Sequence, residues 1–117
     1  MKLDRRHLEI GCDDYARGRF KAAARNFSIA ARYGNAEAQV NLANMYDLGE
    51  GVPVDVKLAV HYYRLAASKG LTQAAYNLFV LYRTRGNMRG ARYWLQRARD
   101  LGDEDALNAQ MDDRNTS

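Results

Sequence analysis

The sequence predicts an all-α protein, a right-handed α-solenoid of about three helix-turn-helix repeats plus a C-terminal capping helix. Three observations lead to this fold class. Proline occurs once in 117 residues, while Ala, Arg, Leu and Tyr are frequent, a composition that favours helix. Apolar residues recur at helical spacing, as at Ala38 and Leu42. The third observation is an internal repeat, because similar segments end at Gly34, Gly70 and Gly102.

The repeat is defined by small and large residues that stay in register. Its three endings are SIAARYG, RLAASKG and QRARDLG, spaced 36 and then 32 residues apart. Upstream of each ending lies one alanine followed by one large residue: Ala23 and Phe27, Ala59 and Tyr63, Ala91 and Leu95. A small alanine lets two helices approach closely, and the large neighbour fills the space beside it. The pattern therefore predicts a pair of packed helices in every unit.

The expected domain organisation is one repeat domain over residues 1–112. Its units are expected at about 3–34, 35–70 and 71–102. The segment 103–112 begins the pattern again for about one helix, so we expect it to cap the stack, with Leu107 covering the last apolar face. Residues 113–117 are predicted to be a disordered tail.

The second unit has a longer joint between its helices than the other two. Its segment GEGVPVD contains the only proline of the chain. Gly49 and Gly51 are expected to end the first helix in left-handed conformations, and Asp55 is expected to begin the second helix as its N-cap. The shorter joints ARGRF and TRGNM account for the difference in repeat spacing.

The residues of the second unit closely resemble the Sel-one-like repeat, a relative of the tetratricopeptide repeat. The family pattern is met at Ala38, Leu42, Tyr46, Gly49, Gly51, Val52, Asp55, Ala59, Tyr62, Tyr63, Ala66, Ala67 and Gly70. The first and third units look more like tetratricopeptide repeats, and the resemblance covers roughly residues 5–102. Asp14 departs from the pattern, since an apolar residue is expected there.

This resemblance implies a protein–protein interaction module, as in bacterial-style adaptors, signalling regulators, secretion-linked factors and immunity proteins that occlude a toxin. In such stacks the first helices of the units line a concave surface, which binds a peptide, a helix or a small domain. The partner-binding residues carried over by alignment are Leu8, Cys12, Tyr15, Glu37, Val40, Asn44, Asp47, Gln73, Tyr76, Val80, Arg83 and Thr84. The alternative is that these residues pack between units or coat a solvated groove. A binding site formed partly by a homodimer also remains open.

A second candidate surface is basic. The stretch 83–99 holds six arginines and no acid, whereas 100–113 holds six acids and no base. A patch for nucleic acid or an acidic partner would comprise Arg85, Arg89, Arg92 and Arg99. The simpler interpretation, which we favour, is a solvated outer face that the acidic segment partly neutralises.

The sequence contains no constellation that indicates catalysis. His7, Cys12 and His61 fall in different predicted helices without metal-ligand spacing, so we expect no metal, no cofactor and no enzyme activity. A single cysteine excludes an intrachain disulfide and favours a reducing compartment, which predicts a cytoplasmic protein. No apolar run approaches the ~18 residues of a membrane helix. The net charge of +4 permits acidic partners without requiring them.

Overall fold

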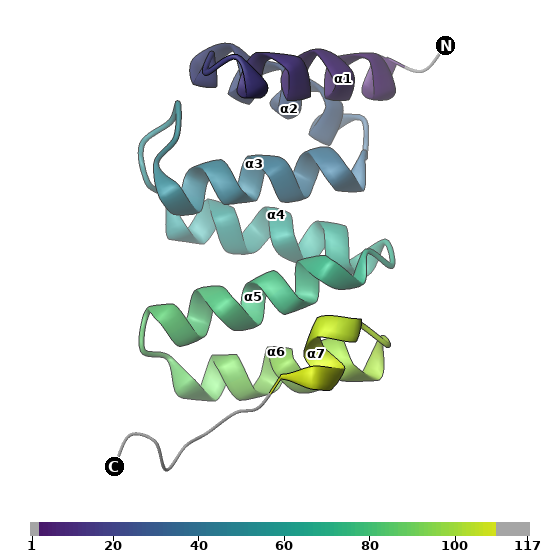
Figure 1. Ribbon diagram of the computed structural model, residues 1–117, viewed down its shortest axis with the longest axis vertical. Helices are drawn as coiled ribbons and strands as arrows, with labels where there is room; N and C mark the ends of the chain where they lie inside the picture. The colour runs from purple at the N-terminus through teal and green to yellow at the C-terminus, as the bar shows by residue number, and fades with distance from the viewer. Residues whose placement is uncertain (1–2, 110–117) are drawn as a thin grey trace. The chain divides into compact units, whose positions relative to one another are not determined.

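The computed structural model describes residues 3–109, and the described part of the chain is entirely helical (Figure 1). This confirms the predicted all-α helical repeat. The helices are α1 (Leu3–Ala16), α2 (Phe20–Arg32), α3 (Ala36–Leu48), α4 (Val56–Ser68), α5 (Thr72–Thr84), α6 (Met88–Asp100) and α7 (Glu104–Asn108). The contacts divide the chain into two compact units, residues 1–71, which contain the first two repeats, and residues 72–117. From here on, the first unit and the second unit are these two parts of the chain. The predicted tail 113–117 and the last residues of the predicted cap lie outside the described residues.

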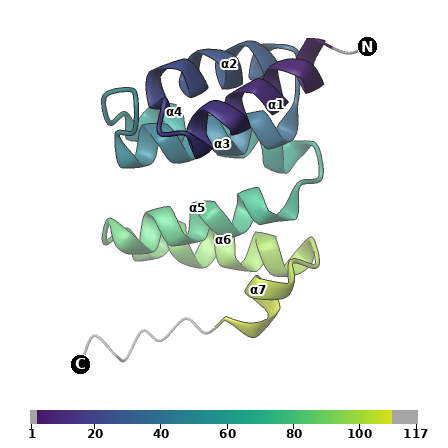
Figure 2. The same cartoon turned by 45° about the horizontal axis from the view of Figure 1, so that its top comes forward.

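The first unit consists of two helix pairs stacked on each other. Helix α1 packs on α2, α3 packs on α4, and α2 also contacts α3 (Figures 1 and 2). Its core is built around Phe27, Leu42 and Met45, whose side chains are at most 2% exposed. Tyr46 and Tyr62 pack against this core with nearly parallel rings.

The repeat register predicted from the sequence is confirmed in both units. Ala23, Ala59 and Ala91 are fully buried. The large residues four positions later, Phe27 and Tyr63 in the first unit and Leu95 in the second, are also buried. The three glycines that end the repeats, Gly34, Gly70 and Gly102, have φ angles of 90°, 91° and 86°, the left-handed backbone expected after a helix.

The long joint between α3 and α4 folds back onto the start of α2. Asp55 caps α4 as predicted, because its side chain accepts a hydrogen bond of 3.1 Å from the amide of Leu58. Gly51 has a φ of 73°, and a Cβ atom there would lie 2.5 Å from the carbonyl carbon and oxygen of Phe20. Gly51 is therefore required by a close backbone approach as well as by the turn. Val52 follows it and packs against the core.

Asp14, which departs from the family pattern, belongs to a polar cluster between α1 and α2. Its carboxylate is almost buried and accepts a hydrogen bond of 3.1 Å from the amide nitrogen of Asn26. The Asn26 amide oxygen lies 2.9 Å from Nδ1 of His7, and Arg19 lies 3.8 Å from the Asp14 carboxylate. Hydrogen bonds thus replace the apolar contact at this position, which allows a carboxylate to be buried there.

The second unit is the α5–α6 pair with the short helix α7 packed on α6. Asp103 begins α7 by accepting a bond of 3.0 Å from the Ala106 amide, and it also accepts one of 3.1 Å from the Thr72 hydroxyl. The prediction that Leu107 covers the last apolar face is wrong, because Leu107 is 59% exposed. Ala106 is the residue that α7 buries.

Candidate protein-interaction site

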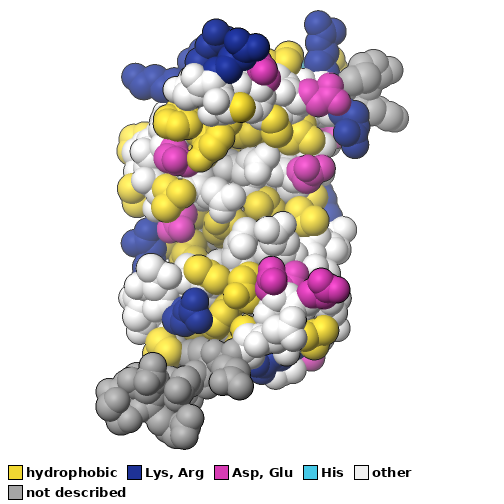
Figure 3. Space-filling view, viewed as in Figure 1, with side chains coloured by type: hydrophobic (Ala, Val, Ile, Leu, Met, Phe, Trp, Pro, Cys, Tyr) yellow, Lys and Arg dark blue, Asp and Glu magenta, His cyan; other side chains and the backbone are white. Residues whose placement is uncertain are grey.

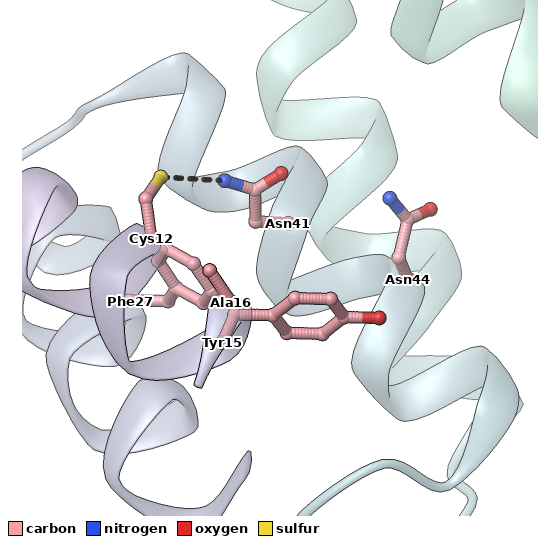
Figure 4. Close-up of a pocket in the computed structure, with 6 residues that line it drawn as sticks. All are labelled: Cys12, Tyr15, Ala16, Phe27, Asn41 and Asn44. Carbon is pink, nitrogen blue, oxygen red and sulfur yellow. Dashed lines mark hydrogen bonds between the residues drawn. The ribbon is translucent and has the colours of Figure 1, made fainter. Parts of the chain in front are cut away.

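The first unit contains a pocket of about 270 Å³ between α1 and α3 (Figure 4). It is lined by Cys12, Tyr15, Ala16, Phe27, Asn41 and Asn44. Phe27 comes from α2 and is 2% exposed, so the pocket reaches down to the hydrophobic core. The volume suits an amino-acid side chain rather than a drug-sized ligand.

Two asparagine side chains from α3 give the pocket a polar wall. The amide nitrogen of Asn41 points towards the sulfur of Cys12, at 4.0 Å (Figure 4). Asn44 accepts a hydrogen bond from the hydroxyl of Tyr63, which fixes its amide oxygen. Tyr63 is a dependable donor, because burial and the nearby Asp47 raise its pKa. The amide nitrogen of Asn44 is not used in that bond and can donate to a ligand.

Nearby acidic side chains raise the pKa values of two ionisable groups at this pocket. Burial raises the pKa of the Cys12 thiol, and the carboxylates of Glu37 and Glu9 raise it further. The hydroxyl of Tyr15 donates a 2.7 Å hydrogen bond to Glu50, and this bond, with burial, raises its pKa. Both side chains are therefore uncharged at neutral pH.

The structure brings together three of the predicted partner-binding residues of the first unit and removes two others. Cys12, Tyr15 and Asn44 line the pocket. Leu8 and Val40 were expected on the binding surface, but their side chains are 4% and 7% exposed. Packing covers both side chains, so the prediction is wrong for these two residues.

Two predicted acidic residues lie beside the pocket rather than in its wall. Glu37 is exposed in the first turn of α3 and raises the pKa of the Cys12 thiol. Asp47 is half-buried near the end of α3 and raises the pKa of the Tyr63 hydroxyl.

The second unit carries the remaining predicted residues on α5. Gln73, Arg83 and Thr84 are exposed, whereas Tyr76 and Val80 are half-buried. The Tyr76 ring contacts the ring of Phe79, and the guanidinium of Arg83 lies 4.7 Å from the centre of the same ring. These contacts hold Arg83 against an aromatic face without removing it from solvent.

The predicted arginine patch of Arg85, Arg89, Arg92 and Arg99 loses one of its members. Arg99 donates hydrogen bonds to the backbone carbonyls of Ala106 and Ala109, the first at 3.0 Å, so its role is to hold α7. Arg85, Arg89 and Arg92 are exposed, and Arg85 and Arg92 also interact with other parts of the protein.

Sequence reasoning missed the apolar lining residues Ala16 and Phe27 and three polar or charged residues in or beside the pocket. Asn41 lies one helical turn before Asn44, so the spacing could have revealed it. Glu9 lies three residues before Cys12 on α1 and could have been found in the same way. Glu50 had no such signal, because it reaches Tyr15 only through the fold of the long joint.

A family model described as Sel1 repeat matches residues 36–71 and 72–103, which is more than half of the chain. The chain belongs to the Sel1 repeat family. The first helix pair lies outside the two matched repeats, and its helices pack in the same manner. Sel1 repeats are in general non-catalytic scaffolds for protein interaction.

The similar proteins are longer than this chain, which spans less than half the length of each one named here. Chitin synthase regulatory factor 4 of Schizosaccharomyces pombe is 35% identical over 82 residues, which are 69% of this chain and 13% of that protein. Protein sel-1 homolog 2 of Homo sapiens is 47% identical over 49 residues, 41% of this chain and 7% of that protein. The crystal structure of a Sel1 repeat protein from Oxalobacter formigenes matches with a TM-score of 0.71 and 28% identity, covering 88% of this chain and 44% of that one.

The described residues contain neither a metal-binding cluster nor a membrane-spanning helix. No group of three or more His, Cys, Asp or Glu side chains among residues 3–109 is placed to hold a metal ion. Within the same residues, no helix is long and apolar enough to cross a bilayer.

Proposed function

We propose that this chain is a non-enzymatic interaction module that binds a segment of another protein in the pocket between α1 and α3. The observation that carries the proposal is the pocket itself, which joins an apolar wall to two amide side chains on the first-helix face of the repeats. An apolar wall can receive a side chain of the partner, while an amide can hydrogen-bond to its backbone. This combination suits an extended or helical peptide.

The role that fits this activity best is that of an adaptor or regulator. One relative named above is called a regulatory factor, and the chain corresponds to a small part of it. A pocket of about 270 Å³ has room for one anchoring side chain of a partner. Tight occlusion of a whole domain, as in a toxin inhibitor, needs a larger contact area than this pocket supplies.

The test is to close the pocket without disturbing the fold. Twelve-residue peptides selected from a random displayed library against the wild-type chain serve as probes. Cys12→Trp fills the pocket from an exposed position of α1, and Ile10→Trp places the same ring on another side of that helix. We expect Cys12→Trp to weaken peptide binding about tenfold or more, and Ile10→Trp to change it less than about twofold.

The result is interpretable only if both variants fold. Circular dichroism and the melting temperature establish this. Peptides that bind wild type and Cys12→Trp equally well would contradict the proposed function, because their site would lie elsewhere.

A further inference from the structure

The pocket of the first unit has an apolar interior that fits one compact side chain. Phe27, Ala16 and the ring of Tyr15 supply this interior, and Phe27 is 2% exposed. The Tyr15 hydroxyl points away to Glu50, so the ring is held in one position at the pocket. An aliphatic side chain such as Leu or Met would be removed from water here.

Three carboxylates lie near this apolar interior. Glu9 lies one turn before Cys12 on α1, and Glu37 lies one turn before Asn41 on α3. Both raise the pKa of the Cys12 thiol, and Glu50 from the long joint accepts a hydrogen bond from the Tyr15 hydroxyl. Figure 3 shows acidic side chains on both sides of the hydrophobic area over α1 and α3.

Basic side chains also lie near this rim (Figure 3), but none of them forms an ion pair with its glutamates among the described residues. Arg17 and Arg19 pair with Asp13 and Asp14, which lie outside the pocket. Arg5 and Arg6 lie one turn before Glu9 on α1, whereas Arg5 precedes Cys12 by seven residues, about 10 Å along the helix. Within residues 3–109, neither Glu9 nor Glu37 is joined to a base in an ion pair. The rim is acidic where Glu37 and Glu50 approach Cys12 and Tyr15, although the chain as a whole carries +4.

We propose that this pocket selects a partner segment in which Lys or Arg residues flank one compact apolar side chain. The inference rests on the proposed function, and it adds the chemistry of the partner. The apolar side chain enters between Tyr15 and Phe27. The flanking cations lie near Glu9, Glu37 and Glu50, where attraction increases the association rate and excludes acidic segments.

The experiment selects twelve-residue peptides from a random displayed library at about 50 mM and at about 300 mM salt. The charge variant is Glu9→Gln with Glu37→Gln, which keeps the side-chain shape. The matched control is Asp100→Asn with Glu104→Gln, which removes two exposed charges from the second unit. Fluorescence anisotropy gives the affinity, and alkylation of Cys12, the only cysteine, reports occupancy of the pocket.

We expect the selected peptides to carry an excess of Lys and Arg around one apolar residue. Their affinity should fall roughly three- to tenfold in the charge variant and less than about twofold in the control. Bound peptide should also slow the alkylation of Cys12, and higher salt should weaken binding.

Two results would overturn the inference, and they are distinguishable. Peptides that Cys12→Trp blocks, but that lack a basic excess or ignore the charge variant, would overturn the charge selection and leave the proposed function standing. If no selected peptide responds to Cys12→Trp, both proposals fail. Basic peptides that lose equal affinity in the charge variant and the control would show non-specific attraction, which also overturns the inference.

Discussion

The first helices of the two units carry the same repeat and opposite surface chemistry. Glu9 of α1 aligns with Asn77 of α5, and Glu37 of α3 aligns with Gln73. Helix α5 contains no acidic residue and carries Arg83 in its last turn, whereas acidic residues lie near the pocket of the first unit. The repeat therefore determines which positions pack, and the positions between them are free to specify a partner.

The joints between the paired helices differ in the same way. The long joint of the first unit packs on α2 through Gly51 and Val52 and supplies Glu50 to Tyr15. The short joint of the second unit contains Gly86, and a Cβ atom there would have no neighbour within 4 Å. The long joint is thus part of the core and of the site, while the short joint only connects two helices.

The largest predicted effect separates these two joints. Gly51→Ala is expected to lower the free energy of unfolding by roughly 2–4 kcal/mol, because it combines a left-handed φ with a backbone clash. Gly86→Ala has the φ penalty alone and should cost about 1 kcal/mol. Urea denaturation of both variants measures the difference. Equal losses would show that the long joint does not pack as described.

A smaller effect concerns the N-caps that bridge helices within each unit. Asn35 caps α3 and donates to Asp4, while Asp103 caps α7 and accepts from Thr72. Asn35→Ala and Asp103→Ala should each cost about 1 kcal/mol. The Asp103 variant should also lose the amide protection of α7, a helix of only five residues, in hydrogen exchange. Persistent protection of α7 would show that its cap is dispensable.

The electrostatic effect of the acidic rim can be measured, without any ligand, from the rate at which Cys12 is alkylated. Glu37→Gln removes a charge that raises the pKa of the thiol, so more thiolate should form at a given pH. Alkylation should then be faster near neutral pH, and its pH profile should move to lower pH. Glu104→Gln, on the second unit, should leave the profile unchanged. An unaltered profile in Glu37→Gln would remove the electrostatic basis of the predicted partner.

The smallest effect is expected on the basic side of the second unit. Arg89→Glu changes an exposed residue of α6 and should alter peptide binding less than about twofold. The same anisotropy assay applies. A loss as large as that of Cys12→Trp would place the site on α6 and favour the arginine surface.

Most of the fold could be predicted because it depends on local rules. Alanines at fixed spacing, glycines after helices and Asp55 before α4 each act through backbone geometry or close packing, which the sequence displays directly. The prediction for Leu107 was wrong because α7 has only five residues. It buries only the side that faces α6, where Arg99 holds it. Asp14 is tolerated through Asn26, a partner twelve residues away.

The site was less predictable, because its depth depends on side-chain burial. Alignment placed Leu8 and Cys12 on one face, yet only Cys12 reaches the pocket while Leu8 is covered. The contact of Tyr15 with Glu50 joins residues 35 apart through the path of the long joint. No spacing rule along a helix encodes such a contact.

The most direct test of the account is to map the site on the folded chain by NMR. The ¹⁵N-labelled protein would be titrated with a selected peptide of known affinity. The account predicts shift changes at Cys12, Tyr15, Asn41 and Asn44, with residues of α5 and α6 unchanged. Shift changes confined to α5 and α6 would contradict it, because the binding surface would then belong to the second unit.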